Sequence, residues 1–246
     1  MFDFSDKTVI VTGAGSGIGR ATAEYFFACG ANVMAADINA DAVAATAAEL
    51  DPTGTRIRSF SYDASLPDDA RALVDATVKS FGGIDYLASC AGIYSSVLAD
   101  QMNDEQWHRM VSVNLDGVFY LVSRAVPHMR DGGAIVTVAS IAAHQGGTLS
   151  HAHYGATKGG VLAYTRGLAR DLAPRIRANT VSPGTIDTPM VTKRIADGGD
   201  ALRQTIPLKR FGKPSEIASV IAFLCSDAAS YVTGEAIIAS GGLYMG

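Results

Sequence analysis

The chain has 246 residues, a length typical of one α/β domain, and its 48% content of hydrophobic residues is enough for a core on both faces of a sheet. Its formal net charge of -4 at pH 7 excludes the basic surface with which proteins bind nucleic acids or anionic membranes. We therefore expect neither a nucleic acid nor a membrane as a partner.

Short runs rich in β-branched residues alternate with longer amphipathic runs, a pattern that predicts strand–helix–strand units and a parallel sheet. Seven strands are expected, at residues 8–12, 32–37, 57–61, 86–89, 134–139, 178–182 and 235–238. Helices are expected at residues 17–29, 40–50, 67–81, 104–129, 153–173 and 214–224. Only residues 184–207 break this rhythm, and we predict that they form a lid over a binding site.

The three cysteines, Cys29, Cys90 and Cys225, lie far apart and match no disulfide or metal-ligand spacing. Free thiols are typical of a reducing compartment. The sequence begins without a basic segment leading into an apolar one, and no apolar stretch reaches membrane-spanning length. These features predict a cytoplasmic protein.

The first predicted strand leads into Gly13-Ala14-Gly15-Ser16-Gly17-Ile18-Gly19, and a predicted helix follows at once. At such a turn, backbone N–H groups and the positive end of the helix dipole surround one anion. Glycines keep side chains from blocking that approach. The segment therefore predicts a site for the pyrophosphate of a dinucleotide.

Asp37 ends the second predicted strand, 18 residues after Gly19. In dinucleotide-binding folds an acid about 20 residues beyond the glycines reaches the adenosine ribose hydroxyls. Its carboxylate would repel a 2′-phosphate, and the nearby Ser16 and Ile38 supply no cation. NAD is thus favoured over NADP, although Arg20 could reverse the preference and Asp37 could instead cap a turn or helix.

Tyr154 and Lys158 lie four residues apart, which places them on one face of the predicted helix over residues 153–173. A phenol with a pKa near 10 is a poor base at neutral pH, but a nearby ammonium or a positive nicotinamide ring favours the phenolate. Tyr154 could then exchange a proton reversibly. Such a pair is common by chance, so its meaning depends on the rest of the chain.

Taken together, these segments resemble the short-chain dehydrogenase/reductase family over essentially the whole chain. The residues that carry the resemblance are Thr12-Gly13 through Gly17-Ile18-Gly19, Asn114, Ser140 and Tyr154 through Lys158. It implies a single-domain Rossmann fold and an enzyme that interconverts a secondary alcohol and a ketone. It also implies a catalytic tetrad, in which Tyr154 is the acid/base and Lys158 lowers its pKa and holds the nicotinamide ribose.

In this tetrad Ser140 binds the substrate oxygen and Asn114 holds a water of a proton relay. Ser140 follows a predicted strand, so its hydroxyl lies at the carboxyl edge of the sheet, where open α/β folds bind ligands. Asn114 is a mediocre helix former inside a helical run, and a kink that frees a carbonyl for water would explain it. The alternatives are a helix cap for Ser140 and a solvent-facing side chain for Asn114.

The resemblance assigns residues 1–130 to a cofactor half and residues 131–246 to a catalytic half. Asp63 should approach the adenine, the segment after Pro183 should lie near the nicotinamide carboxamide, and Arg210-Phe211-Gly212 is a further family-like feature. The expected cofactor contacts are Gly13, Ser16, Gly17, Ile18, Gly19, Asp37, Ile38, Asp63, Ala64, Ala91, Gly92, Tyr154, Lys158, Pro183, Gly184, Ile186 and Thr188.

The chain departs from the family pattern at two places. Ser89-Cys90-Ala91-Gly92 stands where Asn-Asn-Ala-Gly is usual, so the backbone support of those amides must be rebuilt. Cys90 is expected to be a packed thiol and not a nucleophile. Ser240-Gly241-Gly242 replaces the usual Asp-Gly-Gly and leaves the carboxyl-terminal tail less defined. Neither departure affects the tetrad.

The segments expected to face the substrate carry more polar groups than a pocket for a long acyl chain or a steroid needs. The predicted substrate-binding residues are Tyr94, Ser140, His144, His151 and Tyr154. We therefore expect a small polar alcohol such as a sugar, sugar acid or hydroxy acid. The turn from Pro183 to Pro189 is similar to that of relatives acting on hydroxybutyrate or keto-deoxy sugar acids, and Lys193 or Arg194 could bind a carboxylate.

No metal site is expected, because no acid or cysteine completes the set of His144, His151 and His153. One histidine is expected to bind the substrate. The nearest alternative function is a 3-oxoacyl-carrier-protein reductase, which commonly prefers NADP, and a non-catalytic dinucleotide sensor is the alternative from another class. By family analogy, the chain is expected to form a homotetramer through the helices at residues 104–129 and 153–173.

Overall fold

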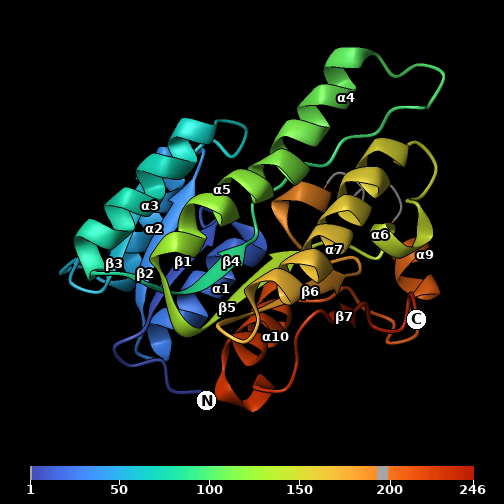
Figure 1. Cartoon of the computed structure of the whole chain (residues 1–246). Coiled ribbons are helices and arrows are strands. Elements are labelled where there is room, and N and C mark those ends of the chain that lie inside the picture. The colour runs from blue at the N-terminus through green and yellow to red at the C-terminus, as the bar shows by residue number, and fades with distance from the viewer. Residues whose placement is uncertain (1, 193–198) are drawn as a thin grey trace.

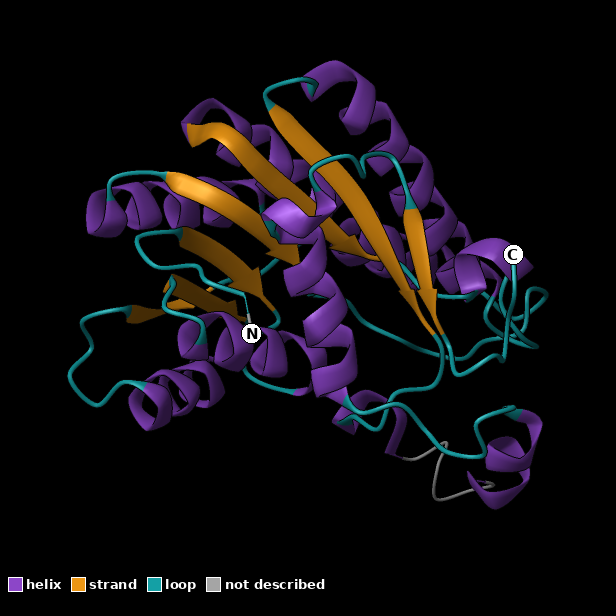
Figure 2. Ribbon diagram, turned by 90° about the horizontal axis from the view of Figure 1, so that it is seen from below, coloured by secondary structure: helices purple, strands orange, loops and turns teal. Residues whose placement is uncertain are grey.

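Parallel strands form the centre of the molecule, and helices cover both faces of their sheet (Figures 1 and 2). The computed structural model describes residues 2–192 and 199–246, which form one seven-stranded sheet in the order β3-β2-β1-β4-β5-β6-β7. The strands are β1 (Thr8–Thr12), β2 (Asn32–Asp37), β3 (Ile57–Ser61), β4 (Ile84–Ser89), β5 (Met129–Val138), β6 (Ile176–Pro183) and β7 (Ala236–Ala239). The predicted doubly wound, Rossmann-type fold is confirmed.

The strand order reverses next to β1, which pairs with β2 on one side and with β4 on the other. Val9, for example, lies opposite both Val33 and Tyr86. In open parallel sheets, the crevice outside the carboxyl ends of the strands at this switch point is where ligands bind. The topology therefore predicts that the chain segments following β1 and β4 form a ligand-binding site.

The helices on the two faces are held by alternating residues of the strands. Val9 and Val11 face a cluster that contains Phe26, whereas Ile10 faces a second cluster that contains Leu73, and all five side chains are buried. The first cluster includes residues of α1 (Gly17–Ala28), α2 (Ala40–Leu50) and α10 (Pro214–Cys225). The second includes residues of α3 (Pro67–Phe81), α5 (Gly117–Ala125) and α7 (Ala152–Leu172). Burial on both faces explains why the strands read as continuous apolar runs.

The predicted helix over residues 104–129 is wrong as a single element. It is α4 (Asp104–Val111), a π-helical turn (Ser112–Asp116), α5 and a short 3-10 turn (Val126–His128), after which Met129 already begins β5. Two helices were not predicted, α6 (Ala142–Gln145) and α9 (Gly199–Thr205). Further 3-10 turns cover Pro189–Val191 and Asp227–Ala229.

The amino-terminal segment lies at the edge of the sheet where the strands begin. The backbone N–H of Phe4 donates to the carbonyl of Cys29 at 2.8 Å, and the ring of Phe4 packs 4.7 Å from that of Phe26 and 5.4 Å from that of Tyr86. The expected dinucleotide turn is at the opposite end of β1.

Within the described residues, no helix combines the length and the apolar character that crossing a bilayer requires.

Candidate active site

The glycine-rich turn after β1 depends on backbone conformations that only glycine adopts easily. Gly13 and Gly17 have φ angles of +69° and +53°, in the left-handed region. At Gly19, a side chain would overlap the backbone of Gly13, so the start of α1 can lie against the end of β1 only with glycine there. The turn thus brings the first backbone N–H groups of α1 to the carboxyl edge of the sheet.

Asp37 is held against this turn from the end of β2. One carboxylate oxygen accepts from the N–H of Gly15 at 2.9 Å and the other from the N–H of Asn39 at 2.9 Å. The guanidinium of Arg20 forms ion pairs with Glu24 and Glu49, each at 2.8 Å, and not with Asp37. The contact of Asp37 with an adenosine ribose stays a prediction.

Two adjoining cavities run along the carboxyl edge of the sheet. A cavity of about 520 Å³ is lined by the predicted cofactor residues from Gly13 to Gly92, and one of about 350 Å³ is lined by Ser140, Tyr154, Lys158 and the predicted cofactor residues from Pro183 to Ile186. Thr188 lines both. They share walls at Ile18, Cys90, Gly92, Ile93 and Met190. Every predicted cofactor residue thus lines one or both of these cavities.

The segment Cys90–Ile93, where the chain lacks the usual pair of asparagines, is supported from two other elements. The hydroxyl of Thr12 accepts from the N–H groups of Cys90 and Ala91, both at 3.1 Å. The side chain of Asn114 accepts from the N–H of Ile93 at 2.8 Å and donates to its carbonyl at 2.9 Å. Burial raises the pKa of the Cys90 thiol to about 12, which fits a packed thiol.

Asn114 lies within the π-helical turn and is fully buried. Its side chain supports Ile93 and lines neither cavity. In this turn the N–H of Gly117 donates to the carbonyl of Ser112, five residues earlier, which displaces the usual α-helical ladder and leaves a carbonyl without its α-helical donor. The interruption expected at Asn114 is present, and a relay water bound there stays a prediction.

Tyr154, Ser140 and Lys158 meet in the smaller cavity. Tyr154 lies in the first turn of α7, Ser140 follows the end of β5, and both residues line this cavity. The Lys158 ammonium donates to the carbonyl of Val138 at 2.8 Å and lies 5.9 Å from the centre of the Tyr154 ring. A carbonyl or hydroxyl in this cavity can therefore meet two O–H groups and a buried cation.

In the protein alone, burial dominates the pKa of Tyr154, and the lowering of this pKa by Lys158 stays a prediction. Burial raises the pKa of Tyr154 to about 12, nearby Tyr94 acts in the same direction, and only the bond from Ser140 opposes them. Burial lowers the pKa of Lys158 to about 8, since its ammonium is desolvated. The ammonium lies beside the tyrosine ring and bonds to the carbonyl of Val138.

The three histidines have separate partners. His144 was predicted to bind substrate, but it lines neither cavity: its Nε2 lies 3.0 Å from the hydroxyl of Ser182 and its ring stacks on Tyr244. The side chain of His144 thus lies toward the carboxyl-terminal tail, and its contact with a substrate stays a prediction. His151 does line the smaller cavity, and its Nε2 lies 2.7 Å from the hydroxyl of Ser96. His153 is fully buried, 3.1 Å from the hydroxyl of Ser95.

The ring of Tyr94 lies between those of His151 and Tyr154. Its ring stacks on that of His151 with centres 4.5 Å apart and meets the ring of Tyr154 edge-on at 5.0 Å. Sequence reasoning did not single out several other lining residues: Ile141, Thr148, Met190, Leu202 and Leu243. Gln145, which lies in the loop expected to face the substrate between Ser140 and Tyr154, also lines the cavity. Lys193 and Arg194, proposed to bind a carboxylate, lie outside the described residues, as does the middle of the predicted lid.

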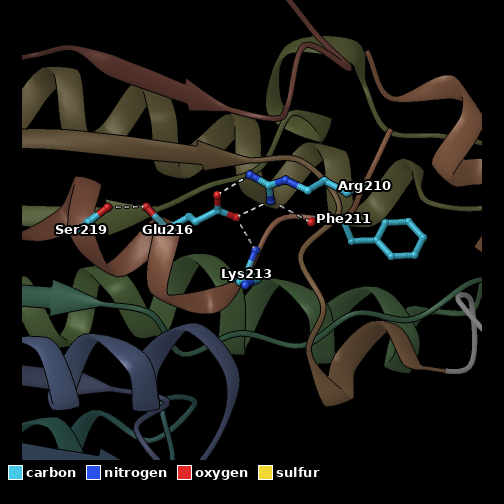
Figure 3. Close-up of polar contacts among 5 residues, drawn as sticks. All are labelled: Arg210, Phe211, Lys213, Glu216 and Ser219. Atoms are coloured by element: carbon cyan, nitrogen blue, oxygen red, sulfur yellow. Dashed lines mark hydrogen bonds and ion pairs between the residues drawn. The ribbon is translucent and has the colours of Figure 1, made fainter. Parts of the chain in front are cut away.

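The residues just before α10 are bonded both to its first turn and to the segment after Pro183, and Figure 3 shows the contacts with the first turn. Arg210 forms two bonds to the Glu216 carboxylate, at 2.8 and 2.6 Å, and Glu216 also accepts from the N–H of Lys213 at 2.7 Å. Between these residues, Gly212 donates to the carbonyl of Thr185 at 3.0 Å and its carbonyl accepts from the N–H of Asp187 at 2.9 Å. The predicted carboxamide-binding segment is therefore fixed to α10.

Comparison with known proteins agrees with this geometry. A family model described as enoyl-(acyl carrier protein) reductase matches residues 13–244. The chain is 39% identical over 240 residues to 3-oxoacyl-(acyl-carrier-protein) reductase FabG of Thermotoga maritima, covering 96% of this chain and 97% of that one. It therefore belongs to the short-chain dehydrogenase/reductase family and is an oxidoreductase that acts on CH–OH groups and binds a nicotinamide dinucleotide.

Two solved structures are similar along their full length. A short-chain dehydrogenase/reductase of Brucella melitensis, described as a glucose/ribitol dehydrogenase, is 51% identical with a TM-score of 0.97, covering 100% of this chain and 99% of that one. A short-chain dehydrogenase of Burkholderia cenocepacia, solved in complex with NADP, is 31% identical with a TM-score of 0.91, and 98% of each chain is covered.

Proposed function

We propose that this chain is an NAD-dependent oxidoreductase that interconverts a secondary alcohol and a ketone on a small polar substrate. The observation that carries the proposal is the convergence of Ser140, Tyr154 and Lys158 in one cavity that shares lining residues with a second cavity, the groove lined by the glycine-rich turn and Asp37. The groove offers the glycine turn to a pyrophosphate, and the cavity offers O–H groups to a substrate oxygen. A non-catalytic dinucleotide sensor would not need the second feature.

In the direction of alcohol oxidation, the Tyr154 phenolate accepts the proton of the substrate hydroxyl while Ser140 holds the same oxygen by a hydrogen bond. A nicotinamide ring bound in this groove would supply the acceptor for the hydride of the substrate carbon and a positive charge that favours the phenolate. Lys158 holds the nicotinamide ribose and adds its own positive charge. Since burial keeps the Tyr154 pKa high in the protein alone, we propose that this lowering depends on the dinucleotide.

The preference for NAD rests on Asp37. Its carboxylate is fixed by two backbone N–H groups, lines the larger cavity, and would lie next to the 2′ position of the adenosine ribose. A 2′-phosphate there would meet a negative charge, and Arg20, the nearby cation, is already paired with two carboxylates. The ribose diol of NAD would instead donate to Asp37.

The substrate class rests on the neutral polar residues of the smaller cavity. Gln145, Thr148, His151 and Tyr94 all line it together with Ser140, and they offer hydrogen bonds to hydroxyl groups. A sugar or polyol fits this set, and the similarity to a protein described as a glucose/ribitol dehydrogenase supports it. A sugar acid or hydroxy acid would in addition need a cation for its carboxylate.

The second candidate is a 3-oxoacyl-carrier-protein reductase, favoured by the identity to the Thermotoga maritima enzyme. The two candidate functions differ in the cofactor and in the substrate that they predict. The first predicts NADH formation from NAD with sugars, polyols or hydroxy acids, and the second predicts NADPH oxidation with a 3-oxoacyl thioester. Both sets should be assayed with both cofactors.

The decisive experiment compares the wild-type chain with Tyr154→Phe and Asp37→Ser. Tyr154→Phe should lower kcat by about 10²–10⁴-fold, the usual contribution of general acid–base catalysis, while the Kd of NADH is unchanged. Asp37→Ser should weaken NADH binding and strengthen NADPH binding, because the repelling charge is removed. Undiminished turnover by Tyr154→Phe, or a wild-type chain that binds neither NADH nor NADPH, would overturn the proposal.

A further inference from the structure

The carboxyl-terminal tail, residues 240–246, returns to the substrate cavity after β7. Leu243 lines the smaller cavity together with Leu202 of α9 and Met190 of the 3-10 turn that follows Thr188. These apolar residues come from the tail and the segment before α10. Polar lining residues come from the loop after β4 and from the segment between Ser140 and Tyr154, and Thr185, Thr188 and Thr205 add hydroxyl groups from the segment before α10.

The tail packs closely on the segment that joins α9 to α10. The N–H of Leu208 donates to the carbonyl of Gly241 at 3.1 Å. A side chain at Gly241 would lie 3.0 Å from Ile206, and one at Gly242 would lie 2.8 Å from Pro207. Both glycines have φ angles in the left-handed region, +65° and +86°. The turn thus requires both glycines, and it is what directs Leu243 back toward the cavity.

Ser240 and Tyr244 close this turn. The hydroxyl of Ser240 donates to the carbonyl of Tyr244 at 3.0 Å and accepts from its N–H at 3.2 Å. The ring of Tyr244 stacks on His144, with centres 5.3 Å apart, and His144 is bonded to Ser182 of β6. Ser240 therefore organises the tail at the position where the family usually has aspartate, and α6, which follows Ser140, anchors it.

We propose that Leu243 is a specificity-determining residue, which limits the length of one apolar substituent on the reacting carbon, and that the Ser240, Tyr244 and His144 contacts hold it in place. The inference rests on the proposed function, because it concerns the substrate of the same cavity. It refines the substrate class: one substituent of the alcohol carbon is short and uncharged where it meets Leu243, whereas the other can carry hydroxyl groups.

The test compares wild type with Leu243→Ala and Leu243→Phe, using 2-butanone, 2-hexanone and 2-octanone as probes with NADH. Leu243→Ala should raise the ratio of kcat/KM for 2-octanone over 2-butanone by about 10-fold or more, since each methylene placed in an apolar pocket changes kcat/KM by about 10–200-fold. Leu243→Phe should lower the ratio. Met245→Ala is the matched control, because Met245 is 77% exposed, and its ratio should equal that of wild type.

Two kinetic outcomes distinguish failure of the inference from failure of the proposed function. A wild-type chain that reduces no ketone and oxidises no alcohol contradicts the proposed function, whereas an unchanged 2-octanone to 2-butanone ratio in Leu243→Ala contradicts the inference alone.

Hydrogen exchange of the carboxyl-terminal peptide tests the contacts that hold Leu243 in place, and it does not require the enzyme to turn over. Exchange should be about 10-fold faster in Ser240→Ala and Tyr244→Ala but not in Tyr244→Phe, and a wild-type tail that exchanges at the unprotected rate would overturn the inference.

Discussion

His153 shows how one side chain can make the stability of this chain depend on pH. It is fully buried, its Nε2 bonds to Ser95, and its Nδ1 has no hydrogen-bond partner among the described residues. Burial lowers its pKa below the ordinary 6.5, and the nearby His151 acts in the same direction. Below pH 6.5 the unfolded chain therefore binds a proton at this site that the folded chain does not, so the free energy of unfolding falls as the pH falls.

We predict that His153→Gln removes this part of the acid sensitivity. A single such group contributes at most about 1.4 kcal/mol per pH unit to the pH dependence of stability. Urea denaturation at pH 7.5 and pH 5.0 should show a smaller loss of unfolding free energy in His153→Gln than in wild type. His128→Gln is the control, since His128 is exposed, and an equal loss in all three proteins would contradict the prediction.

Single residues also show where sequence reasoning reaches its limit. The spacing of Tyr154 and Lys158 placed both on one helix face, and the structure brings them to the same cavity. The raised pKa of Tyr154 could not be foreseen, because burial depends on how distant segments close over a side chain. The contacts of His144 could not be foreseen either, because its partners, Ser182 and Tyr244, are far away in sequence.

Among the elements, the start of α10 fixes the position of the predicted carboxamide-binding segment. Its residues do not contact the proposed catalytic residues. Arg210 and Glu216 are each nearly half exposed, so their ion pair contributes only about 0–1 kcal/mol to stability. Its role is positional, because Gly212 between them is bonded on both sides to Thr185 and Asp187. A loosened pair should disturb the dinucleotide more than the fold.

We predict that Arg210→Met raises the Kd of NADH several-fold and leaves the melting temperature nearly unchanged. Arg210→Lys, which keeps one charged bond to Glu216, should restore part of the affinity. Asp131→Asn breaks the exposed ion pair of Asp131 with Arg175 and serves as the control, with NADH binding equal to wild type. If Arg210→Met binds NADH as tightly as that control, the ion pair does not position the cofactor segment.

The elements that were missed share a physical cause. α6 has four residues and α9 has seven, so neither is long enough to show helical periodicity. The π-helical turn within the predicted long helix depends on contacts with other parts of the chain, such as the two bonds between Asn114 and Ile93. Longer, strongly periodic elements such as α3 and α7 were predicted almost to the residue.

At the scale of the whole molecule, the number of strands and their parallel direction could be predicted from the sequence. The order of the strands in the sheet could not. Alternation of strands with helices predicts a parallel sheet, but the pairing of β1 with β4 is set by packing of the completed domain. Leu87 of β4 is fully buried at this central pair, within the cluster beneath α3 and α5.

We predict that Leu87→Ala lowers the free energy of unfolding by about 2–5 kcal/mol, the usual cost of such a cavity. The measurement is urea denaturation followed by circular dichroism. Leu66→Ala, at a leucine that is 49% exposed, should change the unfolding free energy far less. Equal losses in the two variants would show that β4 is not part of the cooperative core.

The positions of the two ends of the chain have a practical consequence for anyone purifying this protein. A fusion joined after Gly246 would continue from the segment that carries Leu243 into the substrate cavity. A fusion at the amino end would extend from the far side of the sheet, near Phe4 and Cys29. An affinity tag therefore belongs at the amino end. A tag at the carboxyl end would change the measured kinetics, because it extends from the segment that lines the cavity.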